Sequence, residues 1–206
     1  MHWIEPRIDR VWGGFSQAEV TLALLRAALA APTPGYLVFG SGKDYPIATN
    51  ATIDAYLEAN ADVIHLDSAP IDQTWPDQCR TKVEHYTLPF SSSQGDLRPI
   101  PPLRTMTVRC NVGWGRRLVR TFGVRAGLHH WWRMQKPRTL PFGLPYGGSS
   151  WWRTPWDLGG AMVAWIDGQA GYEEQFRYCQ CPDEMFFHTA VAVWRPTVGR
   201  SGAVRA

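Results

Sequence analysis

The chain has 206 residues, of which 45% are hydrophobic and 19% are charged, so it suits one folded domain with a sizeable core and is not a disordered tail. Its formal net charge of +3 is mild and does not by itself indicate a nucleic-acid partner. No segment approaches the roughly 18 apolar residues of a membrane span, and the N-terminus lacks the basic and apolar regions of a signal peptide. We therefore expect a cytoplasmic location, with peripheral membrane association left open.

Helices and strands are predicted to alternate in the first half of the chain. Residues 16–30 combine the capping-box spacing of Ser16 and Glu19 with an apolar stripe, which predicts a helix. The elements that follow are a strand at 35–40, a helix at 51–60, strands at 61–66 and 82–88, and a loop at 91–102. A strand-helix-strand succession favours an α/β architecture with a largely parallel sheet, here in a single domain covering 1–206.

Residues 98–138 hold the strongest charge asymmetry of the sequence. This stretch contains no Asp or Glu, and its ten basic residues are Arg98, Arg104, Arg109, Arg116, Arg117, Arg120, Arg125, Arg133, Lys136 and Arg138. A short basic helix is predicted at 114–125, just before Trp131 and Trp132. The pattern fits either a solvated basic face or a groove that binds nucleic acid, and the sequence leaves both interpretations open.

The cysteines and histidines do not form a metal-binding pattern. The four Cys make no C-x-x-C pair, and the adjacent His129 and His130 lack the spacing of ligands on a helix. We therefore expect no metal site.

A turn of small residues, Gly147 to Ser150, runs directly into Trp151 and Trp152. Glycines allow a close approach of the backbone, and indoles offer flat apolar faces with one N–H donor. The turn and the two indoles are suited to the wall of a site for a polar, flat-faced ligand. Core packing explains one Trp of the pair equally well.

Two further helix starts are predicted in the last third of the chain. Thr154 and Asp157 have capping-box spacing, which predicts a helix that runs to about residue 166. Farther on, Pro182 precedes Asp183 and Glu184, an arrangement typical of the first turn of a helix because acids complement the positive end of the helix dipole.

Four separated motifs together resemble one protein family. In order, they are "WGGFSQAEVTLALLRAAL", "YLVFGSGKDYPIATNATIDAYLEAN", "GGSSWWRTPWD" and "CPDEMFFHTAVA". This order resembles the core-2/I-branching β-1,6-N-acetylglucosaminyltransferases and the related peptide xylosyltransferases, including their bacterial members, over roughly residues 4–192. The resemblance implies an inverting glycosyltransferase with a modified GT-A, Rossmann-like domain. Such an enzyme transfers GlcNAc or xylose from a UDP-sugar to a hydroxyl acceptor, without a cofactor and without the metal-binding Asp-x-Asp motif, which this sequence also lacks.

The resemblance also implies roles for individual residues. Inversion requires a base that takes the proton of the attacking hydroxyl, and the Glu of the family's Pro-Asp-Glu motif falls on Glu184. Asp183 is expected at the helix start or behind the site, and His188, one helical turn on, is expected to be a packing residue rather than a group that tunes the base. The candidates for substrate binding are Ser149, Ser150, Trp151, Trp152, Asp44, Arg80, Lys82 and Glu84. Ser41, Gly42, Asp44 and Pro46 are expected to shape the floor of the cleft, although Asp44 could equally anchor its own turn.

Both ends of the chain depart from the family pattern. The family's first strand and helix are not recognised, and residues 193–206 form an atypical tail in which Arg195, Arg200 and Arg205 cannot be assigned to the diphosphate. We therefore expect an incomplete GT-A domain that is marginally stable, self-associates through an exposed edge and shows little transfer. A catalytically inactive remnant, a carbohydrate-binding module and a nucleic-acid binder using 98–138 stand as alternatives.

Overall fold

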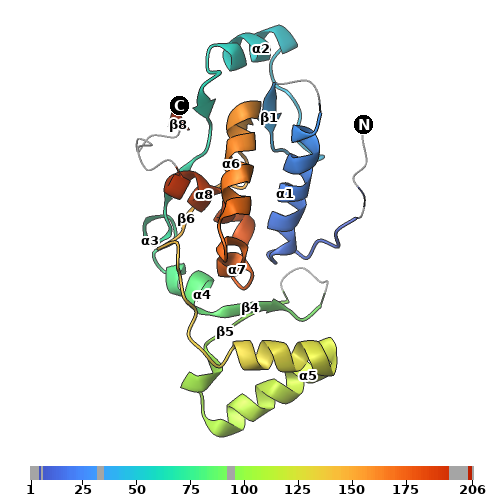
Figure 1. Cartoon of the computed structure of the whole chain (residues 1–206), viewed down its shortest axis with the longest axis vertical. Helices are drawn as coiled ribbons and strands as arrows, with labels where there is room; N and C mark the ends of the chain where they lie inside the picture. Colours follow the sequence, from blue (N-terminus) through green and yellow to red (C-terminus); the bar gives the residue numbers. More distant parts are fainter. Residues whose placement is uncertain (1–4, 6, 32–34, 92–95, 195–203, 206) are drawn as a thin grey trace.

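The computed structural model describes residues 5, 7–31, 35–91, 96–194 and 204–205. Arg195 and Arg200 lie outside these residues. The molecule is elongated: helix α2 (Asn50–Glu58) lies at one end of its long axis and helix α5 (Val108–Arg133) at the other (Figure 1). The helices α1 (Ser16–Leu29), α6 (Trp156–Gly168) and α8 (Phe186–Trp194) lie between these two ends.

The main core forms where α1, α6 and α8 pack together. Helix α1 is confirmed, and it buries Ala18, Leu22 and Leu25, while α8 buries both Phe186 and Phe187. Neither predicted capping box forms, however. Ser16 instead accepts a hydrogen bond from the Val11 amide at 2.9 Å. Thr154 lies in a strand rather than at a helix start, so α6 begins at Trp156 without a side-chain cap.

The expectation of a largely parallel sheet is wrong for the described residues, because every strand pair there is antiparallel. The pairs are β1 (Tyr36–Val38) with β7 (Arg153–Pro155), β2 (Val63–Ile64) with β8 (Val204–Arg205), β3 (Ser68–Pro70) with β6 (Tyr146–Gly148), and β4 (Tyr86–Pro89) with β5 (Leu97–Ile100). Three of the four pairs join segments far apart in the chain. The strands predicted at 35–40, 61–66 and 82–88 therefore do not pair with one another, and the succession of elements misled the prediction.

Short helices fill the connections between these strands. They are α3 (Ile71–Thr74), α4 (Cys79–Glu84), α7 (Tyr172–Phe176) and the 3₁₀ turns η1 (Leu103–Thr105) and η2 (Pro182–Glu184). The predicted strand at 82–88 is thus helical in its first three residues and extended only from Tyr86. The predicted loop at 91–102 contains β5. Thr49 caps α2, since its hydroxyl accepts from the Thr52 amide at 3.3 Å.

Helix α5 is a hairpin of two arms rather than one rod. Gly123 interrupts it with φ 80° and ψ 169°, a conformation that glycine adopts without strain. The arms then approach so closely that a Cβ at Gly127 would lie 2.4 Å from the Val119 backbone. The first arm packs Trp114, Leu118 and Phe122 on a second, smaller hydrophobic cluster around β4 and β5.

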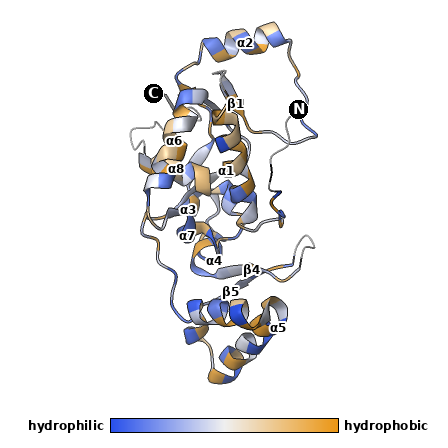
Figure 2. Ribbon diagram, turned by 45° about the vertical axis from the view of Figure 1, so that its right-hand side comes forward, coloured by the Kyte–Doolittle hydropathy of each residue, from blue (hydrophilic) through white to orange (hydrophobic). Residues whose placement is uncertain are grey.

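The helices differ in surface character (Figure 2). The ribbon of α5 alternates between strongly hydrophilic and hydrophobic residues along both arms. Among the residues that the structure describes, no helix combines the length and the apolar character needed to cross a bilayer.

Candidate active site

The two carboxylates of the Pro-Asp-Glu motif lie on the short turn η2, immediately before α8. Cys181 starts the turn in a left-handed conformation with φ 49° and ψ 60°, unusual for a residue with a side chain. Its amide donates to the Gly13 carbonyl at 2.9 Å, which ties the turn to the segment before α1. The buried side chains at the start of α8 then fix the turn against the core.

The turn η2 forms one wall of a pocket of about 380 Å³. The start of α1, the end of β1 and the segment after β6 complete this pocket, which we call the η2 pocket. Its lining residues are Arg10, Trp12, Gln17, Val20, Thr21, Phe39, Gly40, Ser41, Ser150, Trp151, Cys181, Asp183 and Glu184. Glu184 and Trp151 therefore face the same cavity, although they lie 33 residues apart in the chain.

Glu184 is held by a buried lysine. Its Oε2 lies 3.0 Å from Nζ of Lys82, whose side chain is 5% exposed, whereas that of Glu184 is 33% exposed. The ammonium group also lies 4.2 Å from the ring centre of Trp75. Lys82 thus has one carboxylate and one aromatic face as neighbours, and it fixes the position of the Glu184 side chain, which lines the pocket.

Asp183 occupies a different environment from its neighbour. Its Oδ2 accepts a hydrogen bond from Ser150 Oγ at 3.0 Å and a long one from Gln17 Nε2 at 3.5 Å, while its Oδ1 is buried without a partner among the described residues. Burial raises the pKa of Asp183 above the ordinary carboxyl value, an effect that the Ser150 hydrogen bond partly opposes. The side chain therefore holds the glycine-serine segment against η2.

The glycine-serine segment needs its small residues. A Cβ on Gly147 would lie 2.3 Å from the Trp75 ring, and a Cβ on Gly148 would lie 1.8 Å from the Asp67 carbonyl. The next residue, Ser149, accepts a hydrogen bond through its carbonyl from His188 Nε2 at 2.9 Å. A carbonyl only accepts, so Nε2 carries the proton, and the buried Nδ1 has no partner within the described chain.

His188 is fully buried in α8, and burial lowers its pKa to about 4. No hydrogen bond joins it to Glu184 in the described part of the molecule. This geometry agrees with a packing role for His188.

The structure separates the two tryptophans. Trp151 is 51% exposed and lines the η2 pocket, whereas Trp152 is buried against Phe39 and Phe187 and lines no part of it. Ser150 also lines the pocket, and Ser149 lies beside it with its hydroxyl accepting from the Trp151 amide at 3.2 Å.

The remaining predicted residues lie farther out. Asp44 is exposed and accepts from the amide of Ser41, so it anchors its own turn, and of this stretch Ser41 lines the pocket. Arg80 and Glu84 pair with each other at 3.2 Å on the exposed side of α4, one helical turn apart, while Lys82 between them points inward.

Sequence reasoning did not identify the wall that α1 and its approach supply. Arg10, Trp12 and Gln17 line the pocket, and Gln17 also accepts from the Gly13 amide. Arg10 and Trp12 precede α1, and Gln17 lies in its first turn; the sequence predicts this helix only as part of the core. No local pattern distinguishes them, because it is the contact of α1 with η2 that brings them to the site.

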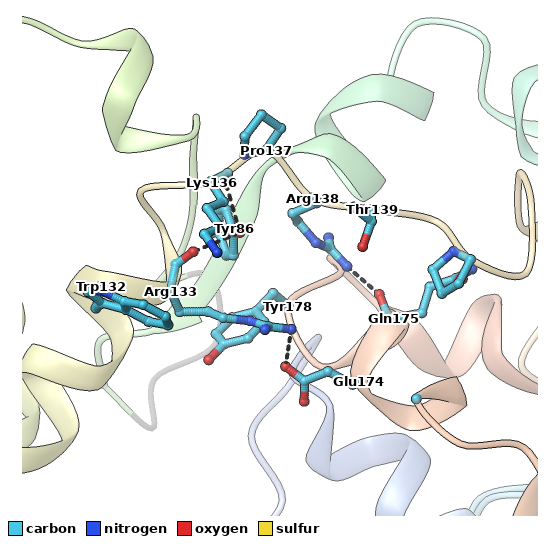
Figure 3. Close-up of a pocket in the computed structure, with 12 residues that line it drawn as sticks. Tyr86, Trp132, Arg133, Lys136, Pro137, Arg138, Thr139, Glu174, Gln175 and Tyr178 are labelled. Atoms are coloured by element: carbon cyan, nitrogen blue, oxygen red, sulfur yellow. Dashed lines mark hydrogen bonds and ion pairs between the residues drawn. The ribbon is translucent and has the colours of Figure 1, made fainter.

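A second pocket of about 290 Å³ lies between α5, β4 and α7 and contains several cations (Figure 3). Arg133 pairs with Glu174 at 2.6 Å, and Arg138 donates to the carbonyls of His85 and Gln175. The arginines here are therefore engaged within the protein. Among the described residues, no cluster of three or more His, Cys, Asp or Glu side chains could hold a metal ion.

The comparisons with known proteins bear on the whole chain. None of the curated proteins with which the chain was compared matches it. A family model described as Core-2/I-Branching enzyme matches residues 3–197, slightly beyond the 4–192 over which the motifs resemble that family. The match covers almost the entire sequence, and the chain therefore belongs to the Core-2/I-Branching enzyme family of glycosyltransferases.

Proposed function

We propose that the protein transfers a sugar, GlcNAc or xylose, from a UDP-sugar to an acceptor hydroxyl with inversion, and that Glu184 is the general base. The observation that carries the proposal is the position of the Glu184 carboxylate. It faces the η2 pocket together with Trp151 and is oriented by the buried Lys82 at 3.0 Å. A base must lie within reach of the proton it removes, and an open pocket beside a half-exposed indole provides room for a sugar hydroxyl.

The proposed reaction is a single displacement at the anomeric carbon. The acceptor oxygen forms a bond to that carbon as the bond to the diphosphate oxygen breaks, the hydroxyl proton passes to Glu184, and UDP leaves. Trp151 supplies a flat face for the acceptor ring, and Asp183 holds Ser150 in place through the 3.0 Å hydrogen bond. Ser149 lies beside this wall and Trp152 lies behind it, whereas Asp44 holds the Ser41 turn on another side of the pocket.

We further propose that the transfer needs no metal ion. The sequence contains no Asp-x-Asp motif. The charge on the departing diphosphate must then be met by Arg or Lys side chains. Arg10 lines the η2 pocket and is the described residue best placed for this role.

The test measures UDP release by the purified chain from UDP-GlcNAc and from UDP-xylose, with and without a hydroxyl acceptor and with and without a chelator. We expect the low release that this chain supports to depend on the acceptor, to survive chelation and to fall by at least about 100-fold in Glu184→Gln, the range of a lost general base. Glu58→Gln, an exposed carboxylate on α2, is the matched control. Equal turnover in Glu184→Gln and the unsubstituted chain would show that Glu184 is not the base.

Sugar binding without turnover of either donor would favour the alternative of a carbohydrate-binding module. In that case Trp151→Ala should still weaken binding, whereas Glu184→Gln should change it little.

A further inference from the structure

The hairpin α5 presents an apolar surface that the rest of the described protein leaves uncovered. A shallow groove of about 520 Å³ lies between its arms, and its lining residues are Val112, Gly115, Arg116, Val119, Arg120, Leu128 and Trp131. Val112 and Leu128 are 45% and 50% exposed. Farther along the same hairpin, Val108, Val124 and Trp132 are also exposed. This concentration of exposed large apolar side chains on one helical element marks an interaction surface.

The same hairpin concentrates positive charge. Val108–Arg133 contains six arginines and no acidic residue, so it carries more positive charge than the net +3 of the whole chain. Arg116 and Arg120 lie at the groove itself. Among the described residues of this hairpin, five exposed arginines have no carboxylate partner: Arg109, Arg116, Arg117, Arg120 and Arg125.

The hairpin is also held in shape before any partner binds. The Trp131 Nε1 donates to Asn111 Oδ1 at 2.8 Å across the two arms, and Asn111 Nδ2 donates to Gln135 at 2.8 Å. Leu118 and its neighbours anchor the inner face of the first arm on the second hydrophobic cluster. The groove therefore lies on a preformed surface at one end of the long axis (Figure 1).

We propose that the α5 hairpin docks on a membrane surface that contains anionic phospholipid. Transfer of the exposed Val and Leu side chains from water to an apolar environment lowers the free energy, and the hydrocarbon boundary of a bilayer is such an environment. The arginines beside them then meet lipid phosphates. A nucleic acid would satisfy the arginines but would leave the apolar groove in water, so the composition of the groove favours lipid.

The inference goes beyond the transferase reaction and is independent of it, because docking requires neither donor nor acceptor. The experiment is vesicle flotation of the purified full chain. We expect binding to vesicles of phosphatidylcholine with phosphatidylglycerol, little binding to phosphatidylcholine alone, and weaker binding as salt is raised.

Two pairs of substitutions separate charge from apolar contact. Arg116→Gln with Arg120→Gln should lower the partition coefficient on anionic vesicles by up to about 30-fold. Val112→Ser with Leu128→Ser should lower it by about tenfold or more although the charge is unchanged. The control, Arg7→Gln with Lys43→Gln, removes two exposed charges outside the hairpin and should have a much smaller effect.

A competing single-stranded oligonucleotide completes the test. Failure to bind anionic vesicles would overturn the proposal. So would binding that the Val112 and Leu128 substitutions leave unchanged and that the oligonucleotide displaces, since that result would indicate a nucleic-acid surface. Far-ultraviolet circular dichroism of each variant checks that the hairpin is still folded, and none of the substituted side chains is buried.

Discussion

The contact between Lys82 and Glu184 is expected to couple the stability of the fold to the chemistry of the site. The perturbation is a double-mutant cycle of Lys82→Met, Glu184→Gln and the two together. Met preserves the length and packing of the Lys stem beside Trp75, and Gln preserves the shape of Glu. Removing Glu184 alone leaves the buried ammonium without its carboxylate, whereas removing both groups leaves no buried charge.

The size of the coupling energy follows from the distance between Lys82 and Glu184 and from the exposure of the Glu184 side chain. Two unit charges 3.0 Å apart attract by about 5–6 kcal/mol at an effective dielectric constant of about 20. Glu184 is one third exposed, so solvent screens part of this attraction, and the Trp75 ring at 4.2 Å partly compensates the stranded ammonium. We therefore expect Glu184→Gln to lower the free energy of unfolding by about 3 kcal/mol, with a coupling energy of about 2 kcal/mol.

Urea unfolding of the four proteins measures the coupling, and thermal melts should show Glu184→Gln about 6–12 °C below the unsubstituted chain. The exposed pair of Arg80 and Glu84 on the same helix is the matched control, and its cycle should give about 0.5 kcal/mol or less. A Lys82–Glu184 coupling energy no larger than that of the control would refute the reasoning.

UDP release by the same four proteins distinguishes support of the fold from chemistry. We expect the double variant to recover most of the stability lost in Glu184→Gln and none of the turnover. Recovery of turnover would mean that Glu184 acts only as the counter-ion of Lys82 and that the base lies elsewhere.

Three further predictions follow from particular side chains. Trp151→Ala should weaken acceptor binding by up to about tenfold in a titration and change the melting temperature little. Trp152→Ala, by contrast, should lower the free energy of unfolding measured in urea by about 3–5 kcal/mol, because that ring is buried. The pKa of His188 is lowered to about 4 in the folded state, whereas its ordinary value is 6.5. Between these two pH values the unfolded chain binds more protons than the folded chain, so the free energy of unfolding should fall by about 3 kcal/mol as the pH drops from 6.5 to 4. His188→Gln should flatten the pH dependence of the free energy of unfolding, and an unchanged pH dependence in this variant would contradict the prediction. Gly148→Ala should lower the free energy of unfolding by several kcal/mol or prevent folding, because its Cβ would collide with a backbone carbonyl. Gly113→Ala, on the open face of α5, should instead raise the free energy of unfolding by about 0.5–1 kcal/mol.

The helices could be predicted where the signal is local. The apolar stripe of α1 and the cap of α2 at Thr49 are properties of neighbouring residues, and both helices form where the sequence indicates them. Helix α5 shows the limit of that signal. The basic pattern at 114–125 predicts a single short helix, but the positive φ of Gly123 divides a longer segment into two arms.

The strand pairing could not be predicted in the same way. Tyr36 lies opposite Pro155, and Ser68 lies opposite Gly148, at sequence separations over which no periodicity carries information. The direction of pairing depends on how the chain returns after α5, which is a property of the whole fold.

The candidate site was predictable in some of its members, apart from the wall that α1 and its approach supply, but not in its contacts. The family motifs bring Glu184, Lys82 and Trp151 into consideration, yet nothing in the sequence pairs the lysine with the glutamate or divides the two tryptophans between pocket and core. Those outcomes depend on which side of α4 faces η2 and on which side of the glycine-serine segment faces the core.

The environments of Asp183 and Glu184 explain how two adjacent carboxylates can have separate roles. Consecutive residues on a tight turn project their side chains in different directions. Both side chains line the η2 pocket, but Asp183 contacts Ser150 of the glycine-serine segment, whereas Glu184 contacts Lys82. Asp183 is partly buried, its pKa is raised, and its hydrogen bond to Ser150 positions the wall that ends in Trp151. Glu184 is partly exposed and is held by an ammonium group, which leaves its outer side free for a hydroxyl. Exchanging the two residues would place the shorter side chain before Lys82 and the longer one against Ser150, so we expect both of these contacts to be disturbed. We therefore expect the order Asp then Glu to matter for the proposed site, whereas either order would serve a helix start equally well.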